Sequence, residues 1–333
     1  MIALLLSLAS AAEHHVVRTG DTLASVAEAL GDPALAETVR TLNGLDASAP
    51  LVVGTVLHLP APAHAEEEGG VVLHVRGGAT ARFVGGGEAD LLPGLTLPLG
   101  TTVCTEDDSF ATLRLTAERH GADHDEITLL EATCVVVAGS GATYGQRTAL
   151  VNLEQGAVDV RLSEASGQLA IATVDGVTAA SDGGFRVAKE DDATRTEAVS
   201  APVSVMGAGV EVELQVGQGS RVKAGEAPSS PVELPSAVVV AGPLEGEVLR
   251  VPSFAWEEVD RALGYRLEIA TEADFTALVF VQETDQARYD ADLLFLPYRV
   301  PGLWWRVSSF DLNGFQGVPS AGTFLLSPGG STL

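Results

Sequence analysis

Basic residues are scarce in this sequence of 333 residues. Lysine and arginine together number 19 against 45 aspartates and glutamates, which gives a formal net charge of −26. A chain with this charge repels nucleic acid and anionic lipid head groups, and no cluster of lysine and arginine offsets the repulsion locally. We therefore expect no nucleic-acid partner, and solubility is the simplest interpretation of the acidity.

Long apolar runs are also missing. The run IALLLSLASA at residues 2–11 is too short to cross a bilayer as a helix, and no other segment is better suited, so we expect no integral membrane segment. The small residues that end this run fit a secretory cleavage pattern, with cuts after Ala11 or Ala12. Residues 1–12 are predicted to be a signal peptide. This segment has little positive charge for a signal peptide, so the true start of the chain stays open. We expect an exported bacterial protein, periplasmic or associated with the cell envelope. The alternative is a cytosolic chain with an apolar first strand.

Cysteine is nearly absent, with only Cys104 and Cys134. Neither cysteine comes directly after the predicted cleavage site, which argues against a lipid anchor on the mature N-terminus. An even pair in an exported protein favours a disulfide, and each cysteine lies in a β-like run. Two buried free thiols remain the alternative.

Hydrophobic residues make up 46% of the chain and there are 36 glycines, which indicates folded, β-rich structure with many turns. Two stretches rich in proline and small or polar residues divide the chain, and their composition favours solvated backbone with some freedom between blocks. The fold class we expect is mainly β and multidomain. The predicted blocks are residues 14–60, 70–226 and 237–327, joined by linkers at 61–69 and 227–236.

The first block predicts the order β-α-α-β. In HVVRTGDTLASVAEAL, a strand is followed by a Gly-Asp-Thr corner and then by apolar residues at helical spacing. A second helix ends in RTLNGL, and VVGTVLHLP closes the block with a strand. In combination these pieces resemble a LysM domain across the whole block. One departure is Val53-Gly54, where the family usually has Pro-Gly.

The resemblance implies a groove for peptidoglycan or another polymer that contains N-acetylglucosamine. Glycine lets a ligand approach the backbone closely, and the N–H groups at a helix N-terminus are unpaired. The implied walls are the corner and the loop after the second helix, with the residues Gly20, Asp21, Thr22 and Leu23 on one side and Leu45, Ala49, Pro50 and Leu51 on the other. The alternative is that Asp21 and Thr22 only cap a helix.

The second block alternates apolar and polar residues around glycine-rich corners, which predicts antiparallel or solenoid-like sheet. Three segments share a strand, glycine corner, strand pattern: LLPGLTLPLGTTV, ALVNLEQGAVDVRL and VELQVGQGSRVKAGE. Spread over the block are the pieces PLGTTVCTEDDSFATLRL, ITLLEAT, LVNLEQGAVDVRL, GGFRVAKEDDATRTEAVSAPVSV and QVGQGSRVKAGE. On these pieces the block as a whole resembles a FecR-type periplasmic domain, which implies an all-β fold of solenoid or sandwich kind. That family includes signalling proteins with a cytoplasmic anti-sigma segment and a transmembrane helix. This sequence shows neither.

The third block resembles a fibronectin type III-like β-sandwich. The resemblance rests on a spacing of W…Y-x-L-x-I…W-W-R-V…G, and DLNG at residues 311–314 is a hairpin-type turn signal. Trp256, Tyr265 and Trp305 are predicted core residues. The alternative is that one of these three aromatic side chains is exposed and stacks on a sugar.

No catalytic set is convincing. Cys134 lacks the glycine-rich surroundings and histidine of a transpeptidase nucleophile, and the histidines of ERHGADHDE, His120 and His124, fit a solvated loop better than a metal site. We therefore expect no cofactor and no enzymatic activity. The leading hypothesis is a cell-envelope protein held on peptidoglycan, with the two later blocks as scaffold or as binding modules for an envelope protein. The alternatives are a periplasmic sensor or partner subunit in FecR-type signalling and, third, a cell-wall hydrolase.

Overall fold

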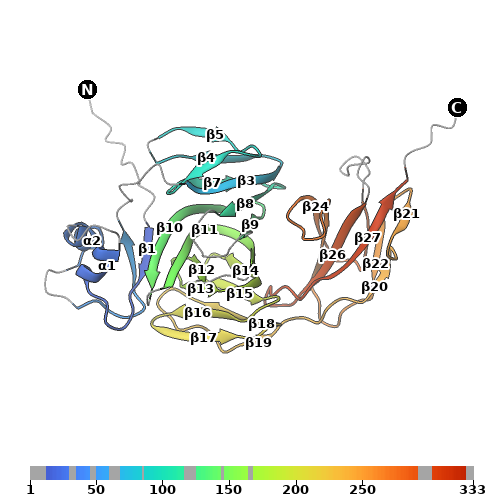
Figure 1. The fold of residues 1–333 in the computed structure, drawn as a ribbon. Helices are drawn as coiled ribbons and strands as arrows, with labels where there is room; N and C mark the ends of the chain where they lie inside the picture. Colours follow the sequence, from blue (N-terminus) through green and yellow to red (C-terminus); the bar gives the residue numbers. More distant parts are fainter. Residues whose placement is uncertain are drawn as a thin grey trace, which may run out of the picture.

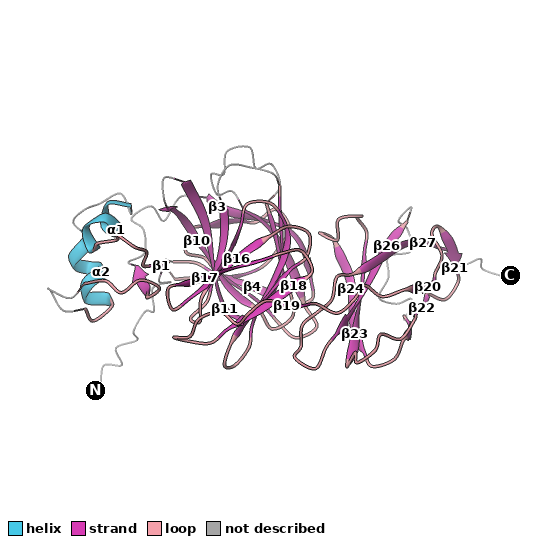
Figure 2. Cartoon of the chain, turned by 90° about the horizontal axis from the view of Figure 1, so that it is seen from below, coloured by secondary structure: helices cyan, strands magenta, loops and turns pink. Residues whose placement is uncertain are grey.

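The computed structural model describes residues 13–29, 35–45, 50–59, 68–84, 86–115, 125–143, 146–163, 168–291 and 302–327. The predicted signal peptide, Ala49, most of the first linker, and both His120 and His124 lie outside these residues. The chain forms three units in sequence order, which are the N-terminal unit, a large β-body and a C-terminal sandwich (Figures 1 and 2).

The N-terminal unit has the predicted order of elements. Strand β1 (Glu13–Val16) pairs antiparallel with β2 (Val56–Leu59), and the helices α1 (Leu23–Ala29) and α2 (Ala36–Leu42) lie between them in sequence. Val26 and Val39 from the two helices and Leu57 from β2 are buried in one apolar cluster. Leu42 at the end of α2 does not join this cluster and is 48% exposed.

The β-body contains strands β3 to β19, all joined by hydrogen bonds. Their bounds are β3 (Glu68–Arg76), β4 (Ala79–Arg82), β5 (Glu88–Asp90), β6 (Thr96–Pro98), β7 (Thr102–Thr105), β8 (Phe110–Leu115), β9 (Glu126–Leu129), β10 (Cys134–Thr143), β11 (Gln146–Leu162), β12 (Gln168–Ala172), β13 (Val177–Ala180), β14 (Gly183–Lys189), β15 (Thr194–Ala198), β16 (Val203–Gly207), β17 (Val210–Leu214), β18 (Gln218–Val222) and β19 (Val232–Glu233).

These strands form two layers that share the long strand β11. One layer runs β6-β3-β8-β9-β11-β14-β15-β18-β19 and the other β5-β4-β7-β10-β11-β12-β13-β16-β17. The inward side chains of both layers meet in a single large apolar core. The prediction of mainly β structure for this block is confirmed.

The chain changes layers at the glycine corners that the sequence repeats mark. In the middle repeat, the first half of β11 pairs with β10 and β12, and the second half pairs with β9 and β14. Gly156 lies at the change with φ +82°, and a Cβ there would meet the Thr133 Cα at 2.6 Å. Only glycine fits this position, because the backbone conformation and the space both exclude a side chain.

A disulfide joins Cys104 on β7 to Cys134 on β10. The two cysteines are direct cross-strand partners, with their Cα atoms 4.2 Å apart. The bridge that the sequence favoured is therefore present in the structure.

The C-terminal sandwich contains β20 (Val240–Gly242), β21 (Glu247–Leu249), β22 (Ser253–Trp256), β23 (Gly264–Ala270), β24 (Leu278–Thr284), β25 (Arg288–Asp290), β26 (Leu303–Phe310) and β27 (Ser320–Leu326). One sheet has the order β20-β22-β25 and the other β21-β27-β26-β23-β24. Between them lie the three aromatic residues predicted for the core, namely Trp256, Tyr265 and Trp305, each at most 4% exposed. Their burial leaves no face for sugar stacking.

The freedom expected at the second linker is not what the structure shows. Strand β19 lies within residues 227–236 and extends the sheet of the β-body by pairing with β18. The C-terminal sandwich then packs on the β-body, with Phe110 of β8 in one apolar cluster with Phe275 and Leu278. Proline-rich composition predicted solvated backbone, but these long-range contacts hold the segment in place.

The N-terminal unit also contacts the β-body. The turn at Val53-Gly54, where the sequence departs from the usual Pro-Gly, meets the turn between β16 and β17. A Cβ added at Gly209 there would lie 2.8 Å from the Val53 carbonyl oxygen. Within the described ranges, no helix has the length and apolar character needed to cross a membrane.

Candidate functional site

The Gly-Asp-Thr corner begins with a tight turn after β1. The Asp21 N–H donates to the Arg18 carbonyl oxygen at 3.1 Å, and Gly20, third in the turn, has φ +95°. This is the position at which a type II turn requires positive φ. A Cβ at Gly20 would find no atom within 4 Å, so the backbone here faces open space.

Asp21 holds the corner together through its side chain. Its Oδ2 accepts a hydrogen bond from the Arg18 N–H at 2.8 Å and lies 2.7 Å from Nε2 of His15. The Asp21 side chain is 23% exposed. Asp21 therefore orders the turn and does not cap the helix. His15 is a partner that sequence reasoning missed, because the six-residue separation gives no periodic signal.

Thr22 is the cap of α1. Its Oγ1 accepts from the Ser25 N–H at 3.1 Å, while the Ser25 Oγ accepts from the Thr22 N–H at 2.9 Å. This reciprocal pair is a capping box in which serine replaces the usual acidic or amide residue. The capping role predicted for Thr22 is confirmed.

The exit from α2 is fixed just as firmly. The Leu45 N–H donates to the Arg40 carbonyl at 3.0 Å, and the Gly44 N–H donates to the Thr41 carbonyl at 3.2 Å. These two bonds, with Gly44 at φ +61°, form a Schellman motif. The motif sets the direction in which the chain leaves the helix towards the predicted second wall.

Asn43 ties this exit to the sheet. Its amide Nδ2 donates to the carbonyl of His58 at 2.6 Å, and its Oδ1 accepts from the His58 N–H at 2.6 Å. The same Nδ2 also donates to the Val39 carbonyl at 2.7 Å. The side chain thus acts as a short piece of added strand on β2. No local pattern in the LNGL segment indicates this role for the asparagine.

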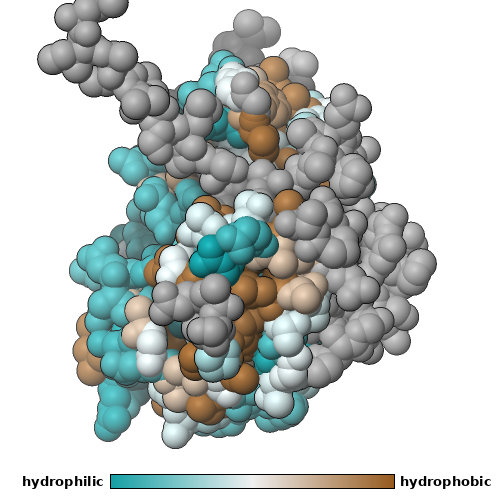
Figure 3. Space-filling model, turned by 90° about the vertical axis from the view of Figure 1, so that its left-hand side faces the viewer, coloured by the Kyte–Doolittle hydropathy of each residue, from teal (hydrophilic) through white to brown (hydrophobic). Residues whose placement is uncertain are grey.

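The structure brings the two predicted walls onto one apolar cluster. Leu23 from the corner and Leu45 and Leu51 from the exit loop are half-buried and pack against the same core. Gly20, Thr22 and Pro50 are exposed beside them. Figure 3 faces the end of the molecule that carries α1 and α2, and shows apolar surface next to hydrophilic surface.

Comparisons with known proteins find a family match for the N-terminal unit and structural matches for part of the chain. Residues 15–60 match the family model described as LysM domain. No curated protein matches the chain. Among solved structures, two crystal structures of a protein described as a "putative anti-sigma factor" from Parabacteroides distasonis match with a TM-score of 0.31, at 13% and 12% identity. Each match covers 40% of this chain, and the chain spans only 59% of the length of those structures.

The family match coincides with the unit built from β1, α1, α2 and β2, including its glycine corner, its capping box and its asparagine exit. A LysM domain implies binding to glycan. Residues 15–60 of this chain are a LysM domain.

Proposed function

We propose that this chain is a non-enzymatic protein of the bacterial cell envelope that binds peptidoglycan through its LysM domain. The observation that carries the proposal is the match of residues 15–60, together with the capping box at the corner and the Asn43 hydrogen bonds at the end of α2. The ligand is a glycan that contains N-acetylglucosamine, and the binding residues are those of the two walls described above.

The β-body and the C-terminal sandwich then act as a scaffold or as protein-interaction modules. We assign the β-body to the FecR-like type, which is supported by its two layers and its glycine layer changes. The C-terminal sandwich is of fibronectin type III-like kind, which is supported by its sheets of three and five strands around an aromatic core. Because both units pack together, the part held away from the glycan is expected to be stiff.

A pull-down of the full chain on purified peptidoglycan sacculi tests the proposal. We expect the unchanged chain to be retained. Pro50→Asp adds a charge to an exposed wall residue, and we expect it to lower the affinity for sacculi by about tenfold or more, or ~1.4 kcal/mol. Leu244→Asp on the C-terminal sandwich is the matched control, because Leu244 is also exposed. It should bind like the unchanged chain.

The same preparation separates the other hypotheses. No retention of the unchanged chain, or equal loss in both variants, would count against glycan binding by the LysM domain. A fall in the turbidity of sacculi on addition of the protein would instead favour the cell-wall hydrolase. Capture of a membrane receptor by residues 70–226 would favour the signalling role.

A further inference from the structure

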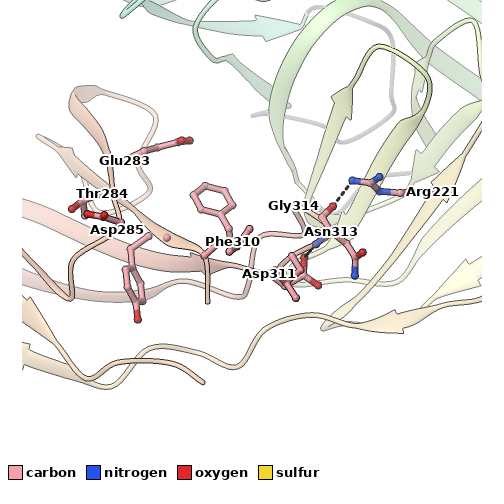
Figure 4. Close-up of a pocket in the computed structure, with 12 residues that line it drawn as sticks. Arg221, Glu283, Thr284, Asp285, Phe310, Asp311, Asn313 and Gly314 are labelled. Carbon is pink, nitrogen blue, oxygen red and sulfur yellow. Dashed lines mark hydrogen bonds between the residues drawn. The ribbon is translucent and has the colours of Figure 1, made fainter. Parts of the chain in front are cut away.

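An open groove lies where the C-terminal sandwich meets the β-body. Its volume is about 690 Å³, within the range of about 300–1,000 Å³ typical of ligand sites. Three segments of the sandwich line it, at residues 263–265, 283–285 and 310–314, and Arg221 of β18 closes it from the β-body. Figure 4 shows Glu283, Thr284 and Asp285 on one side of Phe310 and the 311–314 turn with Arg221 on the other.

The wall formed by the turn after β26 is held by many hydrogen bonds. The Asp311 Oδ1 accepts from the N–H groups of Asn313 at 2.8 Å and Phe315 at 2.9 Å. Arg221 donates to the Asn313 carbonyl and lies over the Phe315 ring, 5.6 Å from its centroid. The Leu263 N–H donates to the Phe310 carbonyl at 2.8 Å, which joins the 263–265 segment to the end of β26. The groove is therefore formed before any ligand arrives.

Two large apolar side chains stand out at this groove. Leu263 is 59% exposed and Leu312 is 70% exposed, and the half-buried side chain of Phe310 lines the same groove. Exposed apolar groups gathered around a hollow and rimmed by polar residues are typical of protein-interaction sites.

The charge of the lining selects the kind of partner. Three carboxylates, on Glu283, Asp285 and Asp311, and one guanidinium, on Arg221, line the groove. Glu283 lies 3.7 Å from Nη1 of Arg266, and its side chain is 58% exposed. The Arg221 guanidinium is already engaged, because its Nη2 lies 3.0 Å from the Glu190 carboxylate. The chain as a whole carries −26, so a second copy or another acidic chain would be repelled. A cationic ligand is attracted to the same rim.

We propose that this groove binds a short basic segment of a partner protein, with an apolar side chain on Leu263 and Leu312 and lysine or arginine side chains at Glu283 and Asp285. The inference rests on the proposed role of the sandwich as an interaction module. It does not depend on glycan binding, which a different unit of the chain carries out.

The test uses the full chain and a short fluorescent peptide of alternating lysine and leucine, with binding followed by anisotropy. The groove variants are the pair Leu263→Ser and Leu312→Ser, and the pair Glu283→Gln and Asp285→Asn. The matched controls are Leu244→Ser with Val248→Ser, and Glu257→Gln with Glu258→Gln, all exposed on the same sandwich away from the groove lining. Thermal melts of every variant check that the fold is retained.

We expect each groove pair to weaken binding about tenfold or more, the usual effect of removing an interface anchor, and each control pair to leave it unchanged. A peptide of alternating lysine and serine should bind more weakly than the lysine–leucine peptide. Equal losses in groove and control variants would mean general attraction to an acidic protein and would overturn the proposal, as would binding that ignores the groove variants. Retention on sacculi is measured separately, so failure of the groove and failure of glycan binding are told apart.

Discussion

The guanidinium of Arg306 on β26 lies 2.9 Å from the carboxylate of Asp159 on β11, and this ion pair joins the C-terminal sandwich to the β-body. On the sandwich side, Arg306 is also hydrogen-bonded to Glu268, and its guanidinium lies over the ring of Phe275. On the β-body side, Asp159 accepts from Arg186 at 2.9 Å, and Arg186 donates on to the Gly317 carbonyl of the sandwich. The contact between the two units therefore combines this charged network with the apolar cluster around Phe110.

Removing Arg306 should undock the two units. Arg306→Met leaves the carboxylates of Asp159 and Glu268 without their shared cation, and breaking a buried pair in this way costs about 3–5 kcal/mol. We expect a single unfolding transition to split into two, with a larger radius in small-angle scattering. Lys223→Met is the control, because Lys223 and Asp192 form an exposed pair that should contribute nothing measurable. A single transition at unchanged temperature in Arg306→Met would contradict the role of this pair.

Acid should weaken the same contact. Burial would raise the pKa of Glu268, but the attraction of Arg306 and Arg266 outweighs burial and lowers the pKa from 4.5 to about 2. Because the folded pKa is depressed, Glu268 contributes stability that is complete above the unfolded value and is lost as the pH falls through the folded value. Urea unfolding should show the advantage of the unchanged chain over Glu268→Gln shrinking as the pH falls from about 4.5 towards 2. A difference that stays constant over that window would contradict this assignment.

Asn43 is expected to stabilise the LysM domain. Asn43→Ala removes three hydrogen bonds and leaves the His58 backbone groups on the edge of β2 without their side-chain partner. A loss of about 1 kcal/mol follows from typical net hydrogen-bond contributions, visible as a lower melting temperature for this unit and as weaker binding to sacculi. Thr41→Ala, on the exposed side of the same helix, serves as a control for helix substitution. Equal effects of the two changes would remove the special role of Asn43.

The bridge between Cys104 and Cys134 should stabilise the β-body. It closes a loop with a sequence separation of 30, and disulfides of this kind contribute about 2–4 kcal/mol, largely by restricting the unfolded chain. The double change Cys104→Ser and Cys134→Ser should lower the unfolding free energy by that amount, and reduction of the unchanged chain should do the same. Mass analysis that finds both thiols free in non-reduced protein would rule out the bridge.

The sequence predicted the LysM unit well because its signals are local. Gly20, Thr22 and Gly44 occupy positions where a turn, a cap and a helix end require those residue types, and these requirements reach only a few residues along the chain. The core aromatics and the cysteine pair were equally readable, from alternation along a strand and from cysteine number. The role of Asn43 was missed because its partner lies fifteen residues away in another element.

The contact between the later units could not be read in the same way. Arg266 and Glu268 alternate with core residues along β23, and such a pattern normally marks a face exposed to water. Here that face is covered, so that Glu268 is 1% exposed. Arg306, which is bonded to Glu268, reaches Asp159 on the β-body 147 positions away in the sequence, beyond the reach of any local pattern.

By itself, then, the sequence determined the nature of the elements: the βααβ unit, the alternating strands, the glycine corners and the residues that cap and fill them. These follow from backbone sterics and from burial, which act within a strand or a turn. Only the tertiary structure decided how the units meet, because Asp159, Glu268 and Arg306 could equally have been solvated on separate domains. Their pairing is stable only where the fold brings opposite charges together and excludes water from between them.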